Sequence, residues 1–304
     1  MKTFISRLLF FLIPFPIYIG VVVIIDPFNY FGVSDFIDYE SKMLTSSKIH
    51  PQLWKLIEYK KVKSNRVILG DSRSVAIDIN NIKQLTGNDI FNCSYGGGTL
   101  IDIIESFWYI TKFQSLEEIY IGINFNLYND FEENNRVEQA KSIMKNPLAY
   151  SFSKIILSAM IQNIKKKLFV KDFKYGTPNM TREEFWSFQL KVTGKRYYQK
   201  FKHPDYYYNE LVKITKYCKQ NNIKLIFFMP PTHVDLQQLI SKFGLEKDFE
   251  IFVDEISGLS LLYNFDTENE YTRNKTNFRD PFHTLSDSLI VHTIWNKKRT
   301  DRRN

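Results

Sequence analysis

Short apolar runs alternate with helix-length segments from residue 66 onward. Five runs are hydrophobic on both faces and too short for ordinary helices: 66–70, 89–94, 118–125, 224–230 and 259–265. Runs of this kind are typical of strands that are covered on both sides. Segments such as 99–113 and 208–222, which lie between them, have helical patterns. The alternation predicts an α/β fold in which helices cover both faces of a parallel sheet.

The alternation stops between about residues 127 and 204. Within this stretch, residues 146–169 read "NPLAYSFSKIILSAMIQNIKKKLF", which is the pattern of an amphipathic helix. We therefore expect a helical insertion at about 127–204. We expect it to cap one edge of the sheet, with the substrate or a partner as its neighbour.

The N-terminus predicts a membrane anchor over residues 1–26. No charged residue occurs from Leu8 to Ile25. At 1.5 Å per residue, a helix of that length crosses most of a bilayer core. A buried core helix is the alternative, but the two prolines of the run and the absence of a polar face disfavour it. No small-x-small cleavage site follows, so we expect the anchor to stay uncleaved.

Charges flanking this run predict its orientation. Lys2 and Arg7 precede it, whereas Asp26, Asp35 and Asp38 follow it. By the positive-inside rule, residues 27–304 then form one extracytoplasmic domain that contains the helical insertion.

Composition narrows the chemistry only slightly. The 304 residues carry a formal net charge of +8, with basic runs at "NKKRTDRRN" and "IKKKLF". We interpret these runs first as solvated surface and second as contacts with anionic phosphates or lipid head groups, and we expect no nucleic-acid partner. Cys93 and Cys218 do not suggest a disulfide framework and are expected to pack as small hydrophobes. No C-x-x-C motif or histidine cluster indicates a metal, and no cofactor is expected.

The stretch "RVILGDSRSVAIDI" places a serine directly after the first predicted strand. Ser72 follows a glycine and precedes a helix-compatible segment, which would expose its hydroxyl at the carboxyl end of the sheet. This position suits a nucleophile. The alternative is a helix cap, a role that Asp71 or Ser74 would fill equally well.

A nucleophilic serine needs a base, and the chain has five histidines. In "FRDPFHTLSDSLIVHTIW", Asp280 precedes His283 by three residues, after the last predicted strand. A carboxylate at that spacing can hold one ring nitrogen while the other accepts the proton of a serine. We predict a Ser72–His283–Asp280 triad. A surface turn is the alternative for His283.

Two further turns offer donors for an oxyanion. Glycines 96–98 in "NCSYGGGT" would let a backbone N–H approach a ligand, although they could also form a mere tight turn. Asn124 in "GINF" could offer its amide, with Asn126 as a competing donor. His233, in "MPPTHVD" after the fourth predicted strand, is a candidate for lining the substrate pocket or for capping a helix.

These motifs together resemble those of the SGNH, or GDSL-like, hydrolase superfamily. "GDSRS" resembles its first block, with Ser72 as nucleophile, and "DPFH" resembles its fifth block through Asp280 and His283. "NCSYGGGT" is similar to the second block, which would put Gly97 in the oxyanion position. "GINF" resembles the third block, with Asn124 as oxyanion donor and Phe125 where the family has an aspartate. The resemblance implies a flavodoxin-like three-layer α/β/α fold of SGNH type.

An anchored chain with an early "GDSRS" is similar to the superfamily members of the bacterial envelope, including partners of membrane-bound O-acyltransferases. The resemblance implies a single-pass protein of the bacterial inner (cytoplasmic) membrane. It would be a serine esterase or O-acyltransferase that acts on a cell-surface polysaccharide through an acyl-serine intermediate. Its partners would be an acylated glycan or acyl donor, the membrane and such an acyltransferase. The alternative is a non-catalytic accessory protein of a polysaccharide assembly or modification complex, which the departure at Phe125 favours.

Overall fold

The structure, a computed structural model, describes residues 4, 7, 10–130, 134–169 and 180–296. The chain divides into two compact units: unit 1 is Met1–Lys61 with Arg136–Thr177, and unit 2 is Val62–Asn135 with Pro178–Asn304. This division differs from the predicted one. Much of the expected insertion belongs with the N-terminal segment, because its long helix packs on a helix from residues 39–49.

Unit 2 contains a five-stranded parallel sheet. Its strands are β1 (Arg66–Leu69), β2 (Phe91–Asn92), β3 (Glu118–Gly122), β4 (Lys224–Met229) and β5 (Leu261–Asn264). They are arranged in the order β2-β1-β3-β4-β5, with every neighbouring pair parallel. This is the strand order of flavodoxin-like doubly wound sheets. The prediction of an α/β fold with a parallel sheet is confirmed, and each of the five predicted strands is present.

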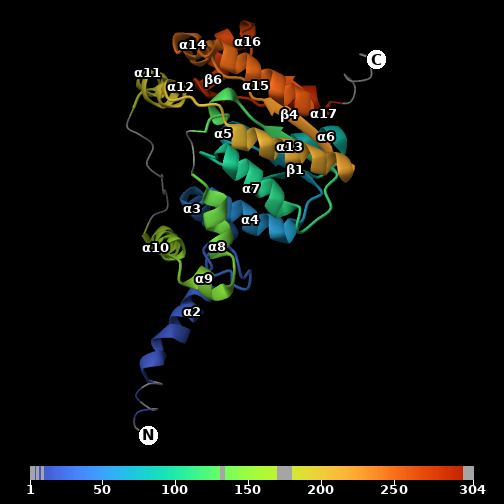
Figure 1. Ribbon diagram of the computed structural model, residues 1–304. Helices are drawn as coiled ribbons and strands as arrows, with labels where there is room; N and C mark the ends of the chain where they lie inside the picture. Colours follow the sequence, from blue (N-terminus) through green and yellow to red (C-terminus); the bar gives the residue numbers. More distant parts are fainter. Residues whose placement is uncertain (1–3, 5–6, 8–9, 131–133, 170–179, 297–304) are drawn as a thin grey trace. The chain divides into compact units, whose positions relative to one another are not determined.

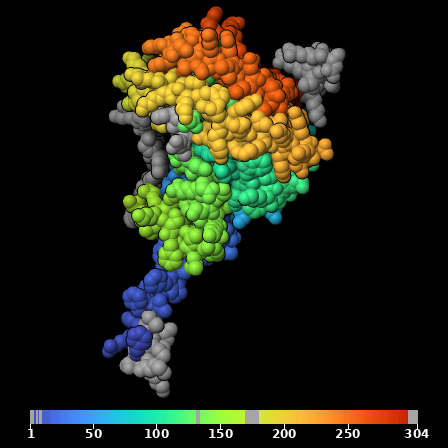
Figure 2. All heavy atoms as spheres, in the orientation of Figure 1, coloured from blue at the N-terminus to red at the C-terminus, as the bar shows by residue number. Residues whose placement is uncertain are grey.

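Helices cover both faces of the sheet. On one face lie α7 (Leu100–Ile110), α13 (Asp205–Gln220) and α15 (Glu246–Leu259), which contact β1, β4 and β5 respectively (Figure 1). Figure 2 shows their side chains, coloured teal to orange, as one continuous surface. On the other face, α6 (Ile79–Thr86) and α17 (Ser288–Trp295) bury Ile82, Ile290 and Trp295 against alternate strand residues such as Ile68 and Tyr120.

The remaining elements of unit 2 are short. The helical ones are α5 (Ser72–Val75), η1 (Phe125–Leu127), α11 (Arg182–Phe188), the π-helix η2 (Gln189–Gly194), α12 (Lys195–Gln199), α14 (Val234–Lys242), α16 (Glu270–Arg273) and η3 (Lys275–Asn277). A separate antiparallel hairpin joins β6 (Phe278–Asp280) to β7 (His283–Thr284). This hairpin contacts α5, which begins at Ser72.

Unit 1 is helical. Its elements are α2 (Pro14–Ile25), α3 (Tyr39–Ile49), α4 (Pro51–Val62), α8 (Arg136–Ile143), α9 (Pro147–Ser151) and α10 (Lys154–Phe169). The predicted amphipathic helix at 146–169 is thus two helices, separated at Phe152 and Ser153. The buried Asn163 of α10 donates to Ser46 of α3 at 2.9 Å. The pairing of α3 with α10 forms the centre of this unit.

The predicted membrane span falls partly outside the described residues. Among the helices that the structure describes, none has both the length and the apolar character needed to cross a bilayer. The helix α2 covers 12 residues of the apolar run.

Candidate active site

Ser72, His283 and Asp280 form a continuous hydrogen-bonded chain. The hydroxyl of Ser72 lies 2.8 Å from Nε2 of His283. On the other side of the ring, Nδ1 lies 2.8 and 2.9 Å from the two carboxylate oxygens of Asp280. Because a carboxylate can only accept, Nδ1 carries the proton, which leaves Nε2 as the acceptor for the Ser72 hydroxyl. The structure therefore brings the three predicted residues together in the order that proton transfer requires.

The Asp-x-x-His spacing reflects a hairpin. Asp280 and His283 are opposite each other in the β6–β7 pair, with Pro281 and Phe282 as the connecting residues. Asp280 is fully buried, and it also accepts from the N–H of Phe282 at 3.0 Å and from Nε of Arg279 at 3.2 Å. Burial acts to raise the pKa of Asp280, but the hydrogen bond and charge of His283, the Phe282 N–H and the Arg279 charge outweigh it, so the pKa lies below its ordinary value. The carboxylate is therefore ionised at neutral pH.

The turn that carries Ser72 is packed tightly onto the sheet. Ser74, two residues after Ser72 in α5, is fully buried. Its Oγ would lie 2.4 Å from a Cβ added at Gly70 and 2.2 Å from one added at Gly122. Since real Cβ atoms do not approach so closely, both strand ends need glycine for α5 to reach its place. Asp71 caps α5 by accepting from the N–H of Arg73 at 3.0 Å. The capping alternative considered for Ser72 is thus filled by its neighbour, and the Ser72 hydroxyl is directed to His283.

A buried ion pair brackets Ser72. The guanidinium of Arg73 donates to both carboxylate oxygens of Asp71, at 3.2 and 2.7 Å. Its remaining nitrogen donates to Oδ1 of Asn126 at 2.8 Å. Burial acts to lower the pKa of Arg73, but Asp71 outweighs it and the pKa lies above its ordinary value. This pair fixes the residues on both sides of Ser72, and the sequence pattern did not indicate it.

The glycine turn after β2 lies beside the Ser72 turn. The N–H of Tyr95 donates to the carbonyl of Gly70 at 3.0 Å, which ties the two loops together. Gly97 has a φ of +66°, a backbone conformation that residues other than glycine rarely adopt. In the part of the chain that the structure describes, the N–H groups of Ser72 and Gly97 donate no hydrogen bond. Both are therefore available to a ligand, as an oxyanion hole requires.

Asn124 is placed differently from the prediction. It is 1% exposed, and its amide nitrogen donates to the carbonyl of Pro230 at 2.8 Å and to Asp266 at 3.1 Å. Both amide hydrogens are thus committed to acceptors inside the protein. Asp266 also accepts from the N–H and hydroxyl of Thr232. In this arrangement Asn124 fastens the loop after β3 to those after β4 and β5, and it has no hydrogen left for an oxyanion.

Phe125, which follows Asn124 in "GINF", belongs to an aromatic cluster. It is 1% exposed, and its ring centroid lies 4.7 Å from that of Phe201 and 5.5 to 6.0 Å from those of Phe249, Phe252 and Tyr198. A carboxylate at this position would be buried among rings. Phe125 therefore packs this part of the site instead of supplying a polar group to it.

His233 is buried and takes the capping role, one of the two roles considered for it. It is 2% exposed and serves as the N-cap of α14: its Nδ1 accepts from the N–H of Asp235 at 3.0 Å. Its Nε2 lies 3.2 Å from the carbonyl of Arg273. The backbone N–H of His233 donates to the carbonyl of Pro281 at 2.9 Å, in the turn between Asp280 and His283. The backbone of His233 therefore supports the β6–β7 hairpin that carries Asp280 and His283. Its ring is buried and both ring nitrogens already have partners.

The loops that follow β1 and β2 thus lie side by side, and among the described residues the N–H groups of Ser72 and Gly97 donate no hydrogen bond. The arrangement has the parts that acyl transfer needs: a hydroxyl, a base oriented by a carboxylate, and donors for a developing oxyanion. Arg73 and Asp266 are the contributors that sequence reasoning missed. The position of Asp266 just after β5 could have indicated a place at the carboxyl end of the sheet. Nothing in "GDSRS" indicates that Arg73 is buried.

Comparison with known proteins adds no family assignment. No family model matches the chain, and no curated protein matches it.

Proposed function

We propose that this protein is an SGNH-type serine esterase or O-acyltransferase. The observation that carries the proposal is the chain from Ser72 Oγ through the His283 ring to the buried Asp280 carboxylate, with contacts of 2.8 to 2.9 Å. The strand order and the "GDSRS" and "DPFH" motifs support the assignment to this superfamily.

In the proposed reaction, Ser72 attacks the carbonyl carbon of an acyl ester while Nε2 of His283 takes the hydroxyl proton. Asp280 stabilises the imidazolium and holds the ring. The N–H groups of Ser72 and Gly97 donate to the oxyanion of the tetrahedral intermediate. When this intermediate collapses, the alkoxide leaving group receives the proton from His283 and Ser72 keeps the acyl group.

The acyl-serine is then resolved by a second hydroxyl. A sugar hydroxyl or a water gives its proton to His283 and its oxygen attacks the acyl carbon. Collapse of the second intermediate releases the new ester or the free acid and returns the proton to Ser72. A sugar hydroxyl makes the reaction a transfer, whereas water makes it a hydrolysis.

We further propose that the protein is a single-pass inner-membrane protein whose main domain is extracytoplasmic and acts on a surface polysaccharide. The uncharged run from Leu8 to Ile25 and the basic residues before it support this topology. A membrane-bound O-acyltransferase is the proposed source of the acyl group. A reporter fused after Asn304 should be active outside the cytoplasm, and activity confined to the cytoplasm would contradict the topology.

A second candidate is a non-catalytic accessory protein of a polysaccharide assembly complex. The committed amide of Asn124 favours it, because the proposed oxyanion hole then rests on backbone donors alone.

One experiment separates the two candidates. The full chain in detergent is given an acyl nitrophenyl ester, alone and with a sugar acceptor. The esterase proposal predicts release of nitrophenol that Ser72→Ala abolishes. Ser74→Ala is the matched control and should act like the wild type, since the buried hydroxyl of Ser74 has no hydrogen-bond partner. Absence of turnover by the folded wild-type chain would favour the accessory role.

A further inference from the structure

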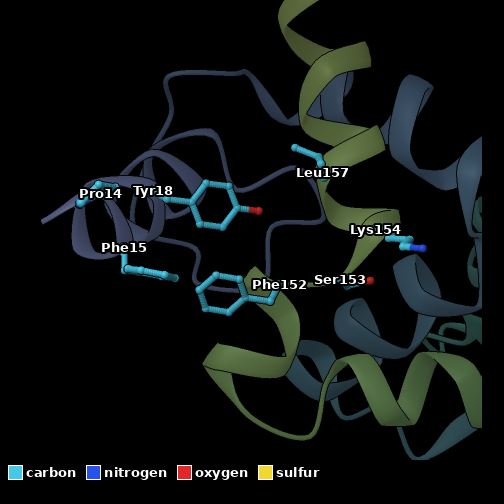
Figure 3. Close-up of a pocket in the computed structure, with 7 residues that line it drawn as sticks. All are labelled: Pro14, Phe15, Tyr18, Phe152, Ser153, Lys154 and Leu157. Carbon is cyan, nitrogen blue, oxygen red and sulfur yellow. The ribbon is translucent and has the colours of Figure 1, made fainter. Parts of the chain in front are cut away.

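Unit 1 contains an apolar hollow outside the candidate active site. It has a volume of about 370 Å³ and lies between α2 and the segment formed by α9, α10 and their connection, called the α9–α10 segment here. Its lining residues, shown in Figure 3, are Pro14, Phe15, Tyr18, Phe152, Ser153, Lys154 and Leu157. The hydroxyl of Tyr18 is engaged with the carbonyl of Ser151 at 2.7 Å. The hollow therefore presents mainly rings and aliphatic carbon to a ligand.

Aromatic contacts hold the α9–α10 segment against the apolar residues of α2. The ring centroid of Phe152 lies 5.4 Å from that of Tyr18 and 6.4 Å from that of Phe15. Both partners of Phe152 are in the middle of the run from Leu8 to Ile25. If that run is in a bilayer, the hollow and the start of α10 are in the bilayer with it.

The exposed face of α10 fits this placement. Its inner face buries Ile156, Ala159 and Met160. A second apolar stripe, with Leu157, Ile161 and Leu168 at 44%, 45% and 62% exposure, faces outward. These three residues are four and seven positions apart, so they lie on one side of the helix. A helix that faced water would carry polar residues there.

The charges around the stripe point to the ligand class. Residues 146–169 contain four lysines and no aspartate or glutamate. The stem of Lys154 lines the hollow, and Figure 3 shows its ammonium turned away from the rings. A lysine that packs its carbon chain against apolar surface and extends its charge beyond it is suited to a lipid head group.

We propose that the hollow binds one acyl chain of an anionic phospholipid, whose phosphate is held by Lys154. The start of α10 is thereby held in the membrane beside the apolar run of α2, and the ammonium of Lys154 extends toward the head groups. The inference rests on the membrane location given under the proposed function, but it does not involve Ser72.

Native mass spectrometry of the full chain in detergent tests this site. The probes are phosphatidylglycerol and phosphatidylcholine with identical acyl chains. The wild type should retain phosphatidylglycerol about fivefold better, the factor expected for one lysine near an anionic surface. Lys154→Gln should abolish this preference by lowering phosphatidylglycerol retention, with a smaller effect on phosphatidylcholine, whose choline offsets the charge of its phosphate. Leu157→Trp, which fills the hollow, should lower retention of both lipids.

Lys242→Gln, on an exposed position of α14 in unit 2, is the matched control and should retain lipids like the wild type. Equal retention of the two lipids by the wild type, or wild-type behaviour of either Lys154→Gln or Leu157→Trp, would overturn the proposal. Ser72→Ala should bind lipid normally. Lipid retention and acyl chemistry can therefore fail independently of each other.

Discussion

Replacing Asp280 by asparagine changes one atom in a fully buried side chain and reverses one hydrogen bond. Asp280 accepts from Nδ1 of His283 through both oxygens, at 2.8 and 2.9 Å. An asparagine that keeps its oxygen on the N–H of Phe282 turns its amide toward the ring. Because that amide donates, Nδ1 must become the acceptor and Nε2 must carry the proton. The Nε2–H then cannot accept the proton of Ser72.

The loss expected from this tautomer change is about 10⁴-fold in kcat/KM, which is about 5.5 kcal/mol of transition-state stabilisation. The cost in folding should be much smaller, about 1 to 3 kcal/mol, because volume and the Phe282 hydrogen bond are kept while a charged hydrogen bond is lost. Activity and stability should therefore separate clearly in this variant.

Nitrophenyl ester turnover over a range of pH measures the first quantity, and urea unfolding of the same preparation measures the second. Asp248→Asn, in the first turn of α15 and outside the triad, is the carboxylate control and should leave turnover unchanged. A folded Asp280→Asn variant with kcat/KM within tenfold of the wild type would refute the argument. The pair of distances from His283 to Asp280 would then have no catalytic meaning.

Three further predictions concern stability. Arg73→Ala should lower the free energy of unfolding by about 3 to 5 kcal/mol, because it leaves the buried carboxylate of Asp71 without its ion-pair partner. Urea unfolding measures this loss, and a loss below about 1 kcal/mol would contradict the prediction. Phe125→Asp should lower the free energy of unfolding by more than about 3 kcal/mol, because it buries a charge among aromatic rings. Thermal unfolding measures this, and an unchanged melting temperature would show that the site is polar. Burial, and after it the charge of Arg136, lowers the pKa of His50 from 6.5 to about 4. The neutral ring therefore stabilises unit 1 fully above pH 6.5, and about 3 kcal/mol of the free energy of unfolding is lost as the pH falls to 4. His50→Gln should remove this part of the acid sensitivity when unfolding is measured as a function of pH. An unchanged pH profile would exclude His50 as its source.

The sheet could be predicted from the sequence because its signal is local. Runs such as "RVIL" and "KLIFFM" are apolar on both faces, and only a sheet covered on both sides buries both faces. The Asp280–His283 pair was predictable for a similar reason, since three residues of spacing suffice to close a hairpin. Ser72 and His283 are 211 positions apart in the sequence. Their pairing was predictable because ligands of doubly wound sheets bind at the carboxyl ends of the strands, which is where both residues were expected.

The remaining features depend on contacts that no local pattern encodes. Asn124 stands in a motif that suggests a free donor, but its hydrogens are taken by Pro230 and Asp266, which are more than 100 positions away. The sequence around His233 allowed either a helix cap or a pocket residue. The choice depends on whether the ring is buried, and the rings that pack against it, Trp186 and Phe278, are distant in the sequence. The division into units follows from the packing of α10 on α3. It could not be predicted, because helical periodicity shows that one face of a helix is apolar but does not show which element covers that face.

Covalent labelling of the full chain by a fluorophosphonate, followed by peptide mass spectrometry, tests most directly whether Ser72 is a nucleophile. We expect one modified serine, Ser72, with labelling that disappears in His283→Ala and persists in Ser74→Ala. A folded wild-type chain that remains unlabelled at Ser72, or labelling at Ser72 that does not depend on His283, would contradict it.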